Sequence, residues 1–261
     1  MLNTMLILNG SSEGEIIDAT RPIIAGAAEV ADAHLIAPHH HPRGQLLYAE
    51  SGVMQVSVGL ATWRVASHCG VWVPSDMPHQ VAANAGVSYR SLYVSPALSN
   101  ALPRCSTAFE IEPLTRELIC EAATFGAAYQ PGSAEARLLA VLQDRLNKLS
   151  SAKISLRLPR DVRAKRVCQA LLDQPADDRS LAAWGRLVGA SNRTLARLFL
   201  RETGMTFGAW VQSMRLILAL ERLAQGASVT RVALDLGYAT PSAFSAMFRR
   251  RLGVSPSRYL V

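Results

Sequence analysis

Cysteines and long apolar runs are scarce in this chain. It has four cysteines, and their scattered positions give neither a close-spaced zinc motif nor a disulfide framework. We therefore expect buried, reduced thiols at Cys69, Cys105, Cys120 and Cys168. No run of about 18 apolar residues occurs, so we expect no membrane-spanning helix. The start, from Met1 to Asp18, lacks a basic segment and is not expected to be a signal peptide. These absences together predict a cytoplasmic protein.

Acidic residues are scarce in the C-terminal part. Residues 156–261 carry 17 Lys and Arg against 7 Asp and Glu, a net charge of +10, whereas residues 1–155 have a net charge of −3. This asymmetry predicts a polyanionic partner for the basic part alone. Its cations are arginines apart from Lys165, and arginine suits bidentate contacts with phosphate and guanine. The alternative is an ordinary solvated basic surface.

The basic part contains an internal repeat. Residues 187–210 recur 49 positions later, at 236–259, with matching apolar, hydroxyl, arginine and glycine positions. Each copy predicts a short helix, a tight turn, a hydroxyl N-cap, a longer helix and a terminating glycine. This is the outline of a helix-turn-helix, so two of them are expected. A repeat can also indicate a solenoid, but solenoids need three or more units.

The first predicted unit has a clear second helix, residues 192–202. Ser180 caps the helix before it, Gly189 permits the turn, Ser191 caps the helix itself, and Gly204 ends it. Helical spacing turns three residues inward: Leu195, Leu198 and Phe199. The same spacing leaves four residues on the outward face: Asn192, Arg193, Ala196 and Arg197. A long apolar helix over residues 207–223 is then expected as a rigid strut.

The second predicted unit repeats this plan with a different outward face. Ser228 and Thr240 are the expected caps, and Pro241 takes the first position of the second helix. The outward residues are small apart from one arginine: Ser242, Ser245, Ala246 and Arg249. Residues 249–251 are three arginines at the helix end, where they either compensate the helix dipole or contact phosphate.

The N-terminal part predicts a β-sandwich or barrel, because short apolar runs alternate with Gly, Pro and Asn. The expected strands are residues 45–49, 53–58, 62–66, 70–73, 79–83 and 89–94. Two strings lie among them: H-x-H-x(3)-Q-x(6)-G, at His39, His41, Gln45 and Gly52, and G-x(3)-P-x(4)-H-x(4)-N, at Gly70, Pro74, His79 and Asn84. These strings resemble the two sequence motifs of the cupin barrel.

The cupin resemblance implies a set of metal ligands at His39, His41, Gln45 and His79, although glutamate is expected where Gln45 stands. Three imidazoles and an amide oxygen can still hold Zn²⁺, Ni²⁺ or Fe²⁺, but the loss of the anionic ligand predicts weaker binding and does not support redox chemistry. The alternative is that the histidines line a pocket or meet solvent. His40 is expected at the surface. A barrel of this type has room for a small ligand, and the expected lining, which could equally be core, is Leu47, Val56, Trp63 and Trp72.

Two helical segments, 114–125 and 134–149, follow the predicted barrel. The second carries a leucine stripe that suits packing on the barrel or self-association into a homodimer. Pro159 is then expected in the first turn of the next helix. The chain is thus expected to be an α+β protein of two domains: a cupin-like effector-binding and dimerisation domain at 1–150, a linker at 151–158, and an all-α double helix-turn-helix domain at 159–261.

Two strings of the C-terminal part are specific enough to indicate a family. Residues 233–259, A-L-D-L-G-Y-A-T-P-S-A-F-S-A-M-F-R-R-R-L-G-V-S-P-S-R-Y, and residues 193–207, R-T-L-A-R-L-F-L-R-E-T-G-M-T-F, resemble the AraC/XylS family of bacterial transcription regulators. The resemblance implies two recognition helices that enter successive major-groove segments. The positions that match the family's base-reading residues are Asn192, Arg193, Ala196, Arg197, Pro241, Ser242, Ser245 and Ala246.

The expected function is therefore a sequence-specific DNA-binding transcription regulator, not an enzyme, controlled by a small molecule bound in the cupin-like domain. We expect the first unit to choose the DNA site, with the capping residues Ser191 and Thr240 and the basic Arg249 also at the DNA. The expected partners are double-stranded DNA, a small-molecule effector, a second copy of the chain and RNA polymerase. One alternative is a cupin-type metalloenzyme tethered to a DNA-binding arm, which the substitution at Gln45 disfavours. Another is a regulator whose barrel only dimerises.

Overall fold

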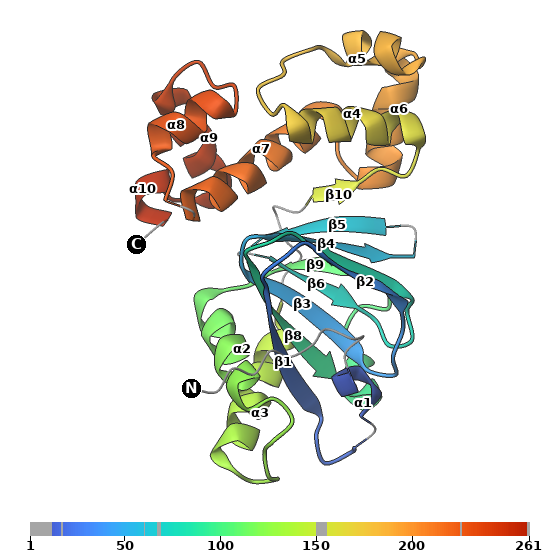
Figure 1. Cartoon of the computed structure of the whole chain (residues 1–261), viewed down its shortest axis with the longest axis vertical. Coiled ribbons are helices and arrows are strands. Elements are labelled where there is room, and N and C mark those ends of the chain that lie inside the picture. The colour runs from blue at the N-terminus through green and yellow to red at the C-terminus, as the bar shows by residue number, and fades with distance from the viewer. Residues whose placement is uncertain are drawn as a thin grey trace. The chain divides into compact units, whose positions relative to one another are not determined.

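The structure is a computed structural model that describes residues 12–16, 18–59, 61–66, 69–149, 156–224 and 226–259. The chain divides into two units, Met1–Lys153 and Ile154–Val261, and each is described by itself. The first unit is β-rich and the second is helical (Figure 1), which confirms the predicted α+β fold class. Of the predicted linker, residues 151–155 lie outside the described residues, and Leu156–Leu158 form strand β10.

Antiparallel strands form two sheets in the first unit. One sheet has the order β1 (Ile23–Val30), β8 (Val87–Val94), β3 (Gly44–Ser51), β6 (Cys69–Val73) and β9 (Thr107–Glu110). The other contains β5 (Ala61–Ala66), β4 (Val53–Val58), β7 (His79–Ala83) and β2 (His34–His39) in that order. The six predicted strands are confirmed. Strands β1, β2 and β9 were missed, because β1 is rich in alanine and glycine and β2 contains a proline, which strand propensities disfavour.

Successive residues of a strand face opposite sides of its sheet, and in the first unit they enter two different hydrophobic cores. In β6, Val71 and Val73 belong to the core between the sheets, whereas Trp72 belongs to a second core on the other face of the same sheet. The second core is completed by helices α2 (Pro113–Phe125) and α3 (Ala134–Leu146), which cover that face (Figure 1). A short helix, α1 (Pro96–Ser99), and a 3₁₀ turn, η1 (Ser12–Glu15), complete the described elements of the unit.

The leucine stripe of α3 packs inside its own unit. Leu142 and Leu146 of the stripe are buried in the second core, and Leu138 and Leu149 pack against it, which confirms the prediction of packing on the β-rich part. The flanking Leu139 is buried in the same core. The helix ends at Leu146, three residues before the predicted end, because Asn147 is its C-cap. Leu114, in the first turn of α2, is 54% exposed.

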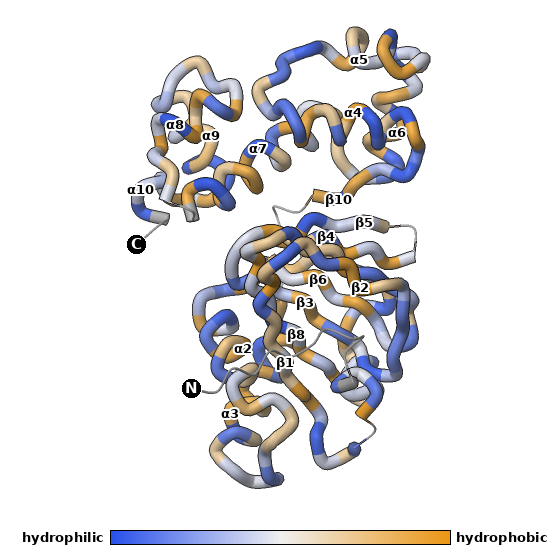
Figure 2. Tube along the Cα trace, viewed as in Figure 1, coloured by the Kyte–Doolittle hydropathy of each residue, from blue (hydrophilic) through white to orange (hydrophobic). Residues whose placement is uncertain are grey.

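The second unit consists of helices after the short strand β10. They are α4 (Val162–Asp173), α5 (Leu181–Val188), α6 (Asn192–Thr203), α7 (Phe207–Ala224), α8 (Val229–Asp235), α9 (Pro241–Leu252) and α10 (Pro256–Tyr259). In Figure 2, hydrophobic and hydrophilic positions alternate along α4 and α6, as expected of helices with one buried face. The predicted start of α4 at Pro159 is wrong, because the Asp161 side chain accepts a hydrogen bond from the Arg163 amide and caps the helix two residues later. No helix within the described ranges is long and apolar enough to cross a membrane.

The four cysteines differ in burial. Cys69 and Cys168 are buried as predicted, and burial raises the pKa of both thiols. The prediction of burial is wrong for Cys105, which is exposed, and for Cys120, which is only partly buried. Cys105 lies in the loop before β9, and Cys120 lies on the partly exposed side of α2. The scattered positions of the four cysteines along the sequence did not indicate which of them would be buried.

Candidate functional site

Helices α5 and α6 form the first helix-turn-helix. The Ser191 hydroxyl accepts a hydrogen bond from the Thr194 amide at 3.1 Å and caps α6, as predicted. Gly189 closes α5 in the left-handed conformation, with φ of 68°. A second glycine, which sequence spacing missed, lies inside α5: a Cβ on Gly185 would lie 2.4 Å from the Ala190 carbonyl oxygen. The tight approach of the turn to α5 therefore requires a residue without a side chain.

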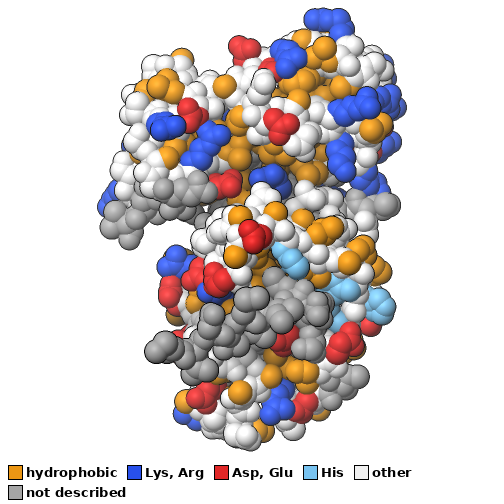
Figure 3. Space-filling view, in the orientation of Figure 1, with side chains coloured by type: hydrophobic (Ala, Val, Ile, Leu, Met, Phe, Trp, Pro, Cys, Tyr) orange, Lys and Arg blue, Asp and Glu red, His pale blue; other side chains and the backbone are white. Residues whose placement is uncertain are grey.

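The outer face of α6 is exposed and basic. Asn192, Arg193, Ala196 and Arg197 are all exposed, as predicted. The inward set Leu195, Leu198 and Phe199 is buried. Over the described part of the chain, neither Arg193 nor Arg197 forms an ion pair, whereas Arg179 and Arg163 pair with nearby aspartates. Figure 3 shows Lys and Arg side chains gathered at the end of the second unit that carries α4, α5 and α6. The outer face of α6 thus presents free guanidinium groups.

A buried carboxylate joins α6 to α4, a contact that the sequence did not reveal. Glu202 accepts hydrogen bonds from the backbone amides of Arg160 and Asp161, at 2.8 and 3.0 Å, and from Arg201. Burial raises the pKa of Glu202, but these hydrogen bonds outweigh it, and the net pKa lies below the ordinary value. The glutamate, in its charged form, therefore holds the start of α4 against α6.

Helices α8 and α9 form the second helix-turn-helix. The Thr240 hydroxyl accepts a hydrogen bond from the Ala243 amide at 3.1 Å, and Pro241 opens α9, as predicted. The turn contains Gly237, with φ of 78°, against which Ala176 packs so closely that a Cβ would lie 2.8 Å from its backbone. On the outer face, Ser242, Ala246 and Arg249 are exposed, whereas Pro241 and Ser245 are partly buried.

The three arginines at the end of α9 have different surroundings. Arg251 is partly buried and donates a hydrogen bond to the Ser213 hydroxyl of α7 at 2.8 Å. Arg249 and Arg250 are exposed. Arg251 therefore ties α9 to α7, and only the other two are free to contact a phosphate.

Helix α7 packs against elements of both helix-turn-helix units. The ring of its Trp210, fully buried, lies 5.8 Å from that of Phe199 in α6, and the indole donates to the Arg157 carbonyl at 2.9 Å. Farther along α7, the Arg215 guanidinium donates to the Pro175 carbonyl and lies 5.8 Å over the ring of Tyr238, which follows α8. These contacts confirm the predicted strut.

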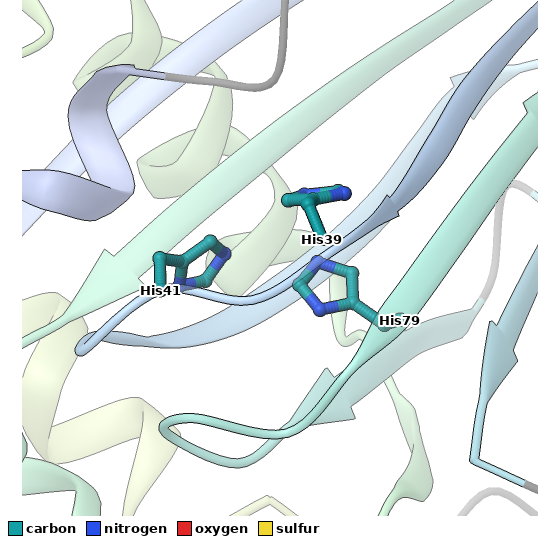
Figure 4. A group of neighbouring side chains, drawn as sticks. All are labelled: His39, His41 and His79. Carbon is teal, nitrogen blue, oxygen red and sulfur yellow. The ribbon is translucent and has the colours of Figure 1, made fainter.

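The first unit brings the predicted histidine cluster together (Figure 4). His39, at the end of β2, and His79, at the start of β7, are cross-strand partners, and His41 follows two residues after β2. Their ligand atoms lie within 4.8 Å of one another. Gln45 comes from β3 in the other sheet, and its Oε1 lies 2.9 Å from Nε2 of His79 and 3.4 Å from Nε2 of His41. All four predicted ligand residues therefore meet at one point between the sheets.

The two buried histidines are held neutral. Burial, with a smaller contribution from the neighbouring histidines, lowers the pKa of His79 to about 4. Burial also lowers the pKa of His41. The Nδ1 atoms of His39, His41 and His79 face backbone carbonyls at 2.9, 2.6 and 2.9 Å, so each ring is oriented by its own loop or strand. His40 is exposed, as predicted.

An N-terminal segment, residues 12–16 and 18–22, borders this cluster and was not predicted. Gly14 packs so closely on His41 that a Cβ would lie 2.5 Å from its ring. Arg43, 2% exposed, donates to the carbonyls of Ile16 and Arg21 at 2.7 and 2.8 Å, and to further carbonyls of Asp18, Pro22 and Tyr93. Burial lowers the pKa of Arg43, but the five carbonyl acceptors stabilise its charge.

The four predicted pocket residues do not share one surface. Leu47, Val56 and Trp63 lie in the core between the sheets, but Trp72 lies in the other core, where its indole donates to the Pro103 carbonyl. The prediction that Trp72 lines the same space is wrong, because neighbouring residues of a strand face opposite sides. A separate cavity of about 230 Å³ is lined by Glu110, Glu112, Thr115, Arg145, Lys148 and Leu149.

Two family profiles match this chain, one in each unit. The profile described as "AraC-like ligand binding domain" matches residues 21–158, and the profile described as "Helix-turn-helix domain" matches residues 184–260.

The relatives that match this chain are named as transcription regulators. The chain is 34% identical to the HTH-type transcriptional regulator NimR of Escherichia coli K12 over 224 residues, which cover 85% of this chain and 81% of NimR. It is 38% identical to the regulator RipA of Corynebacterium glutamicum over 102 residues, 39% of this chain and 31% of RipA. Among solved structures, ToxT from Vibrio cholerae matches with a TM-score of 0.40 and 14% identity, over 91% of this chain and 96% of that chain.

Proposed function

The chain belongs to the AraC family of transcription regulators, and we propose that it selects its DNA site mainly through helix α6. It is a DNA-binding transcription regulator with an N-terminal ligand-binding domain, so its partners are double-stranded DNA and a small-molecule effector. The proposal concerns how the two helix-turn-helix units share the work on the DNA.

The observation that carries the proposal is the contrast between the outer faces of α6 and α9. Arg193 and Arg197 are exposed, one turn apart and free of ion pairs in the described structure. At the corresponding face of α9, Ser242 and Ala246 have short side chains with few hydrogen-bonding groups. A guanidinium forms a bidentate contact with guanine that discriminates against other bases, whereas small side chains discriminate weakly. Helix α6 therefore reads bases, and α9 mainly positions the protein, with Arg249, Ser191 and Thr240 near the backbone phosphates.

The test is to compare Arg197→Ala with the matched control Ser245→Ala. A bound DNA fragment is first selected with the full chain, and affinities are then measured for every single-base-pair variant of it. Arg197→Ala is expected to lower the affinity by about 1–3 kcal/mol and to relax specificity at one base pair. Ser245→Ala is expected to change the preference at no position by as much. Binding of both variants should still weaken steeply with salt.

Two results would contradict this division of roles. An equal loss of affinity across all DNA variants would make Arg197 a phosphate contact rather than a base contact. A larger loss of base preference in Ser245→Ala than in Arg197→Ala would make α9 the helix that selects the site.

We propose that the effector binds at the histidine end of the space between the two sheets. His39 is partly buried, whereas His41 and His79 are buried, so we infer that an effector reaches this end from the side of His39. Leu47, Val56 and Trp63 lie in the packed core of the same space, so the proposal rests on the histidines rather than on these residues. Chemical-shift changes that appear at His39 and His79 when an effector is added would support it.

Four further proposals complete the function. The chain acts as a regulator and not as an enzyme, in the cytoplasm, where bacterial DNA lies. It contacts RNA polymerase when bound at a promoter. It forms a homodimer through the outer surface of α2 and α3, where Leu114 and Val141 are 54% and 48% exposed. Sedimentation equilibrium that shows only monomer at working concentrations would contradict the dimer.

A further inference from the structure

We propose that Arg215, in α7, is a positioning residue that fixes the second helix-turn-helix in one orientation relative to the first. The contacts around it, here named the Arg215 junction, are those of Arg215 with Pro175, Asp177 and Tyr238. The inference rests on the proposed function only in that both helix-turn-helix units contact the DNA, and it is independent of which unit selects the site. It gives a role in DNA binding to residues that lie outside α6 and α9.

On one side, Arg215 holds the segment between α4 and α5. Its Nε donates to the Pro175 carbonyl at 2.9 Å and its Nη2 donates to the Asp177 carbonyl at 3.3 Å. One edge of a planar guanidinium thus binds two carbonyls, which the ammonium of a lysine cannot do in the same geometry. The segment is tied in turn to the first helix-turn-helix, because the Asp177 carboxylate accepts a hydrogen bond from Arg179, whose guanidinium lies 4.0 Å over the ring of Trp184 in α5.

On the other side, the same guanidinium faces the second helix-turn-helix. It lies 5.8 Å over the ring of Tyr238, and the centroid of that ring lies 5.4 Å from the centroid of the Phe244 ring in α9. Ala176, between the two residues whose carbonyls Arg215 binds, packs against Gly237 so closely that a Cβ on the glycine would lie 2.8 Å from the Ala176 Cα. The segment between α4 and α5 therefore joins the two units through a connection that is separate from the covalent one along α7.

The far end of α9 is held at the same stretch of α7. Arg251 donates to the hydroxyl of Ser213, which lies two residues before Arg215. The first turn of α9 thus reaches α7 through Tyr238, and its last turn reaches α7 through Arg251. A helix held at one end can swing about that end, whereas a helix held at both ends cannot turn without breaking one of the contacts.

The donors of Arg215 are engaged inside the protein. The side chain is partly buried, its Nε and Nη2 face backbone carbonyls, and its flat face lies over Tyr238. We therefore expect Arg215 to act on DNA binding through the orientation of the second unit and not through a phosphate contact of its own. A fixed orientation reduces the freedom that is lost when both units bind one DNA molecule. Loss of Arg215 should weaken only the binding that uses both units.

The experiment compares the affinities of the full chain for two duplexes: the selected DNA fragment, and a truncated duplex that lacks the segment contacted by the second unit. Arg215→Met keeps the aliphatic stem, and it should bind the selected fragment about tenfold more weakly and the truncated duplex as the natural chain does. Tyr238→Leu should have the same effect, whereas Tyr238→Phe keeps the ring and should retain the natural affinity. The matched control is Lys165→Met, which removes an exposed cation of α4 and should leave the ratio of the two affinities unchanged.

Two further measurements separate positioning from other roles. The slope of log affinity against log salt should be the same for Arg215→Met as for the natural chain, because no phosphate contact is lost. A slope smaller by about 0.9 would make Arg215 a phosphate contact and would overturn the proposal. In the free protein, residual dipolar couplings of the α6 and α9 amides should fit one alignment tensor in the natural chain and require two in Arg215→Met.

Circular dichroism shows whether each variant is folded, and if Arg215→Met is not, Tyr238→Leu carries the same test. The proposal is overturned if the folded variants bind both duplexes as the natural chain does, if they bind both more weakly by the same factor, or if the natural chain already requires two tensors. Equal affinity of the natural chain for the two duplexes would instead contradict the place of α9 on the DNA in the proposed function. The dipolar couplings would then decide on the Arg215 junction.

Discussion

Replacement of Glu202 by alanine should destabilise the second unit through the loss of one buried acceptor. The Glu202 side chain is 5% exposed and accepts from two backbone amides at the start of α4. A hydrogen bond to a charged group contributes about 1.5–3 kcal/mol, so two of them amount to about 3 kcal/mol at the lower end of that range. Glu202→Gln keeps an acceptor oxygen and loses the charge, and its expected cost is about 1 kcal/mol.

The assay is urea unfolding of the full chain, followed by the far-UV circular dichroism of its helices. Arg201→Ala is the matched control, because the Arg201 side chain is 62% exposed and its ion pair with Glu202 should contribute no more than about 1 kcal/mol. Amide hydrogen exchange at residues 160–173 should accelerate in Glu202→Ala and not in Arg201→Ala, because the loss is local to the start of α4.

Two outcomes would refute this reasoning. If Glu202→Ala costs less than Arg201→Ala, the exposed ion pair and not the buried acceptor stabilises the junction. If Glu202→Gln costs as much as Glu202→Ala, the acceptor oxygen is not what matters. The pKa of Glu202 is lowered in the fold from 4.5, so its contribution should be complete at neutral pH and disappear as the pH falls through the lowered value.

Three further predictions concern single residues. Gly185→Ala should destabilise the chain by about 2 kcal/mol, because its Cβ would lie 2.4 Å from the Ala190 carbonyl oxygen. The control Gly208→Ala, whose Cβ would meet open space within α7, should raise the stability in thermal unfolding by about 0.5–1 kcal/mol. A rise in stability in both variants would contradict the close approach at Gly185. Arg43→Met should lower the free energy of unfolding by about 3 kcal/mol and speed amide hydrogen exchange in the N-terminal segment. Arg43→Lys should not restore the protection from exchange, since one ammonium cannot reach five carbonyls. Full protection in Arg43→Lys would contradict the role given to the guanidinium. The hydrogen bonds from Arg163 outweigh the desolvation effect and lower the pKa of Asp161 from 3.8 to about 2. In acid titrations its contribution to stability should therefore persist above pH 3.8 and be lost between pH 3.8 and 2. An Asp161→Asn variant with the same acid unfolding profile would rule this out.

The helix-turn-helix elements could be predicted closely because their signals are local. A cap hydroxyl such as Ser191 or Thr240 bonds an amide three residues away, and a glycine such as Gly204 adopts a left-handed conformation at the helix end. Helical periodicity then places Leu195 inward and Arg197 outward without reference to any other part of the chain. The start of α4 was predicted less well, because Pro159 and Asp161 are both suitable for a helix start and only the observed hydrogen bond decides between them.

The histidine cluster was predicted as a set of residues but not as a geometry. The spacing of His39, His41 and Gln45 is visible along the chain, yet the distance from Gln45 to His79 depends on how two sheets face each other. Contacts across large sequence separations, such as those of Arg43 with the N-terminal segment, carry no periodic or compositional signal. For Trp72 the strand was predicted correctly, but the core that its side chain enters was not.

The sequence by itself determined six strands of the first unit and most helices of the second, where most of those helices begin and end, which face of α6 is basic and to which family the chain belongs. These properties depend on interactions within a few residues, or on patterns that repeat along the chain. Only the tertiary structure decided that Glu202 joins α4 to α6, that Gly185 lies against the turn, and that three histidines share the oxygen of one glutamine. Such contacts form when distant segments pack, and burial then determines which polar atoms must find partners inside the protein.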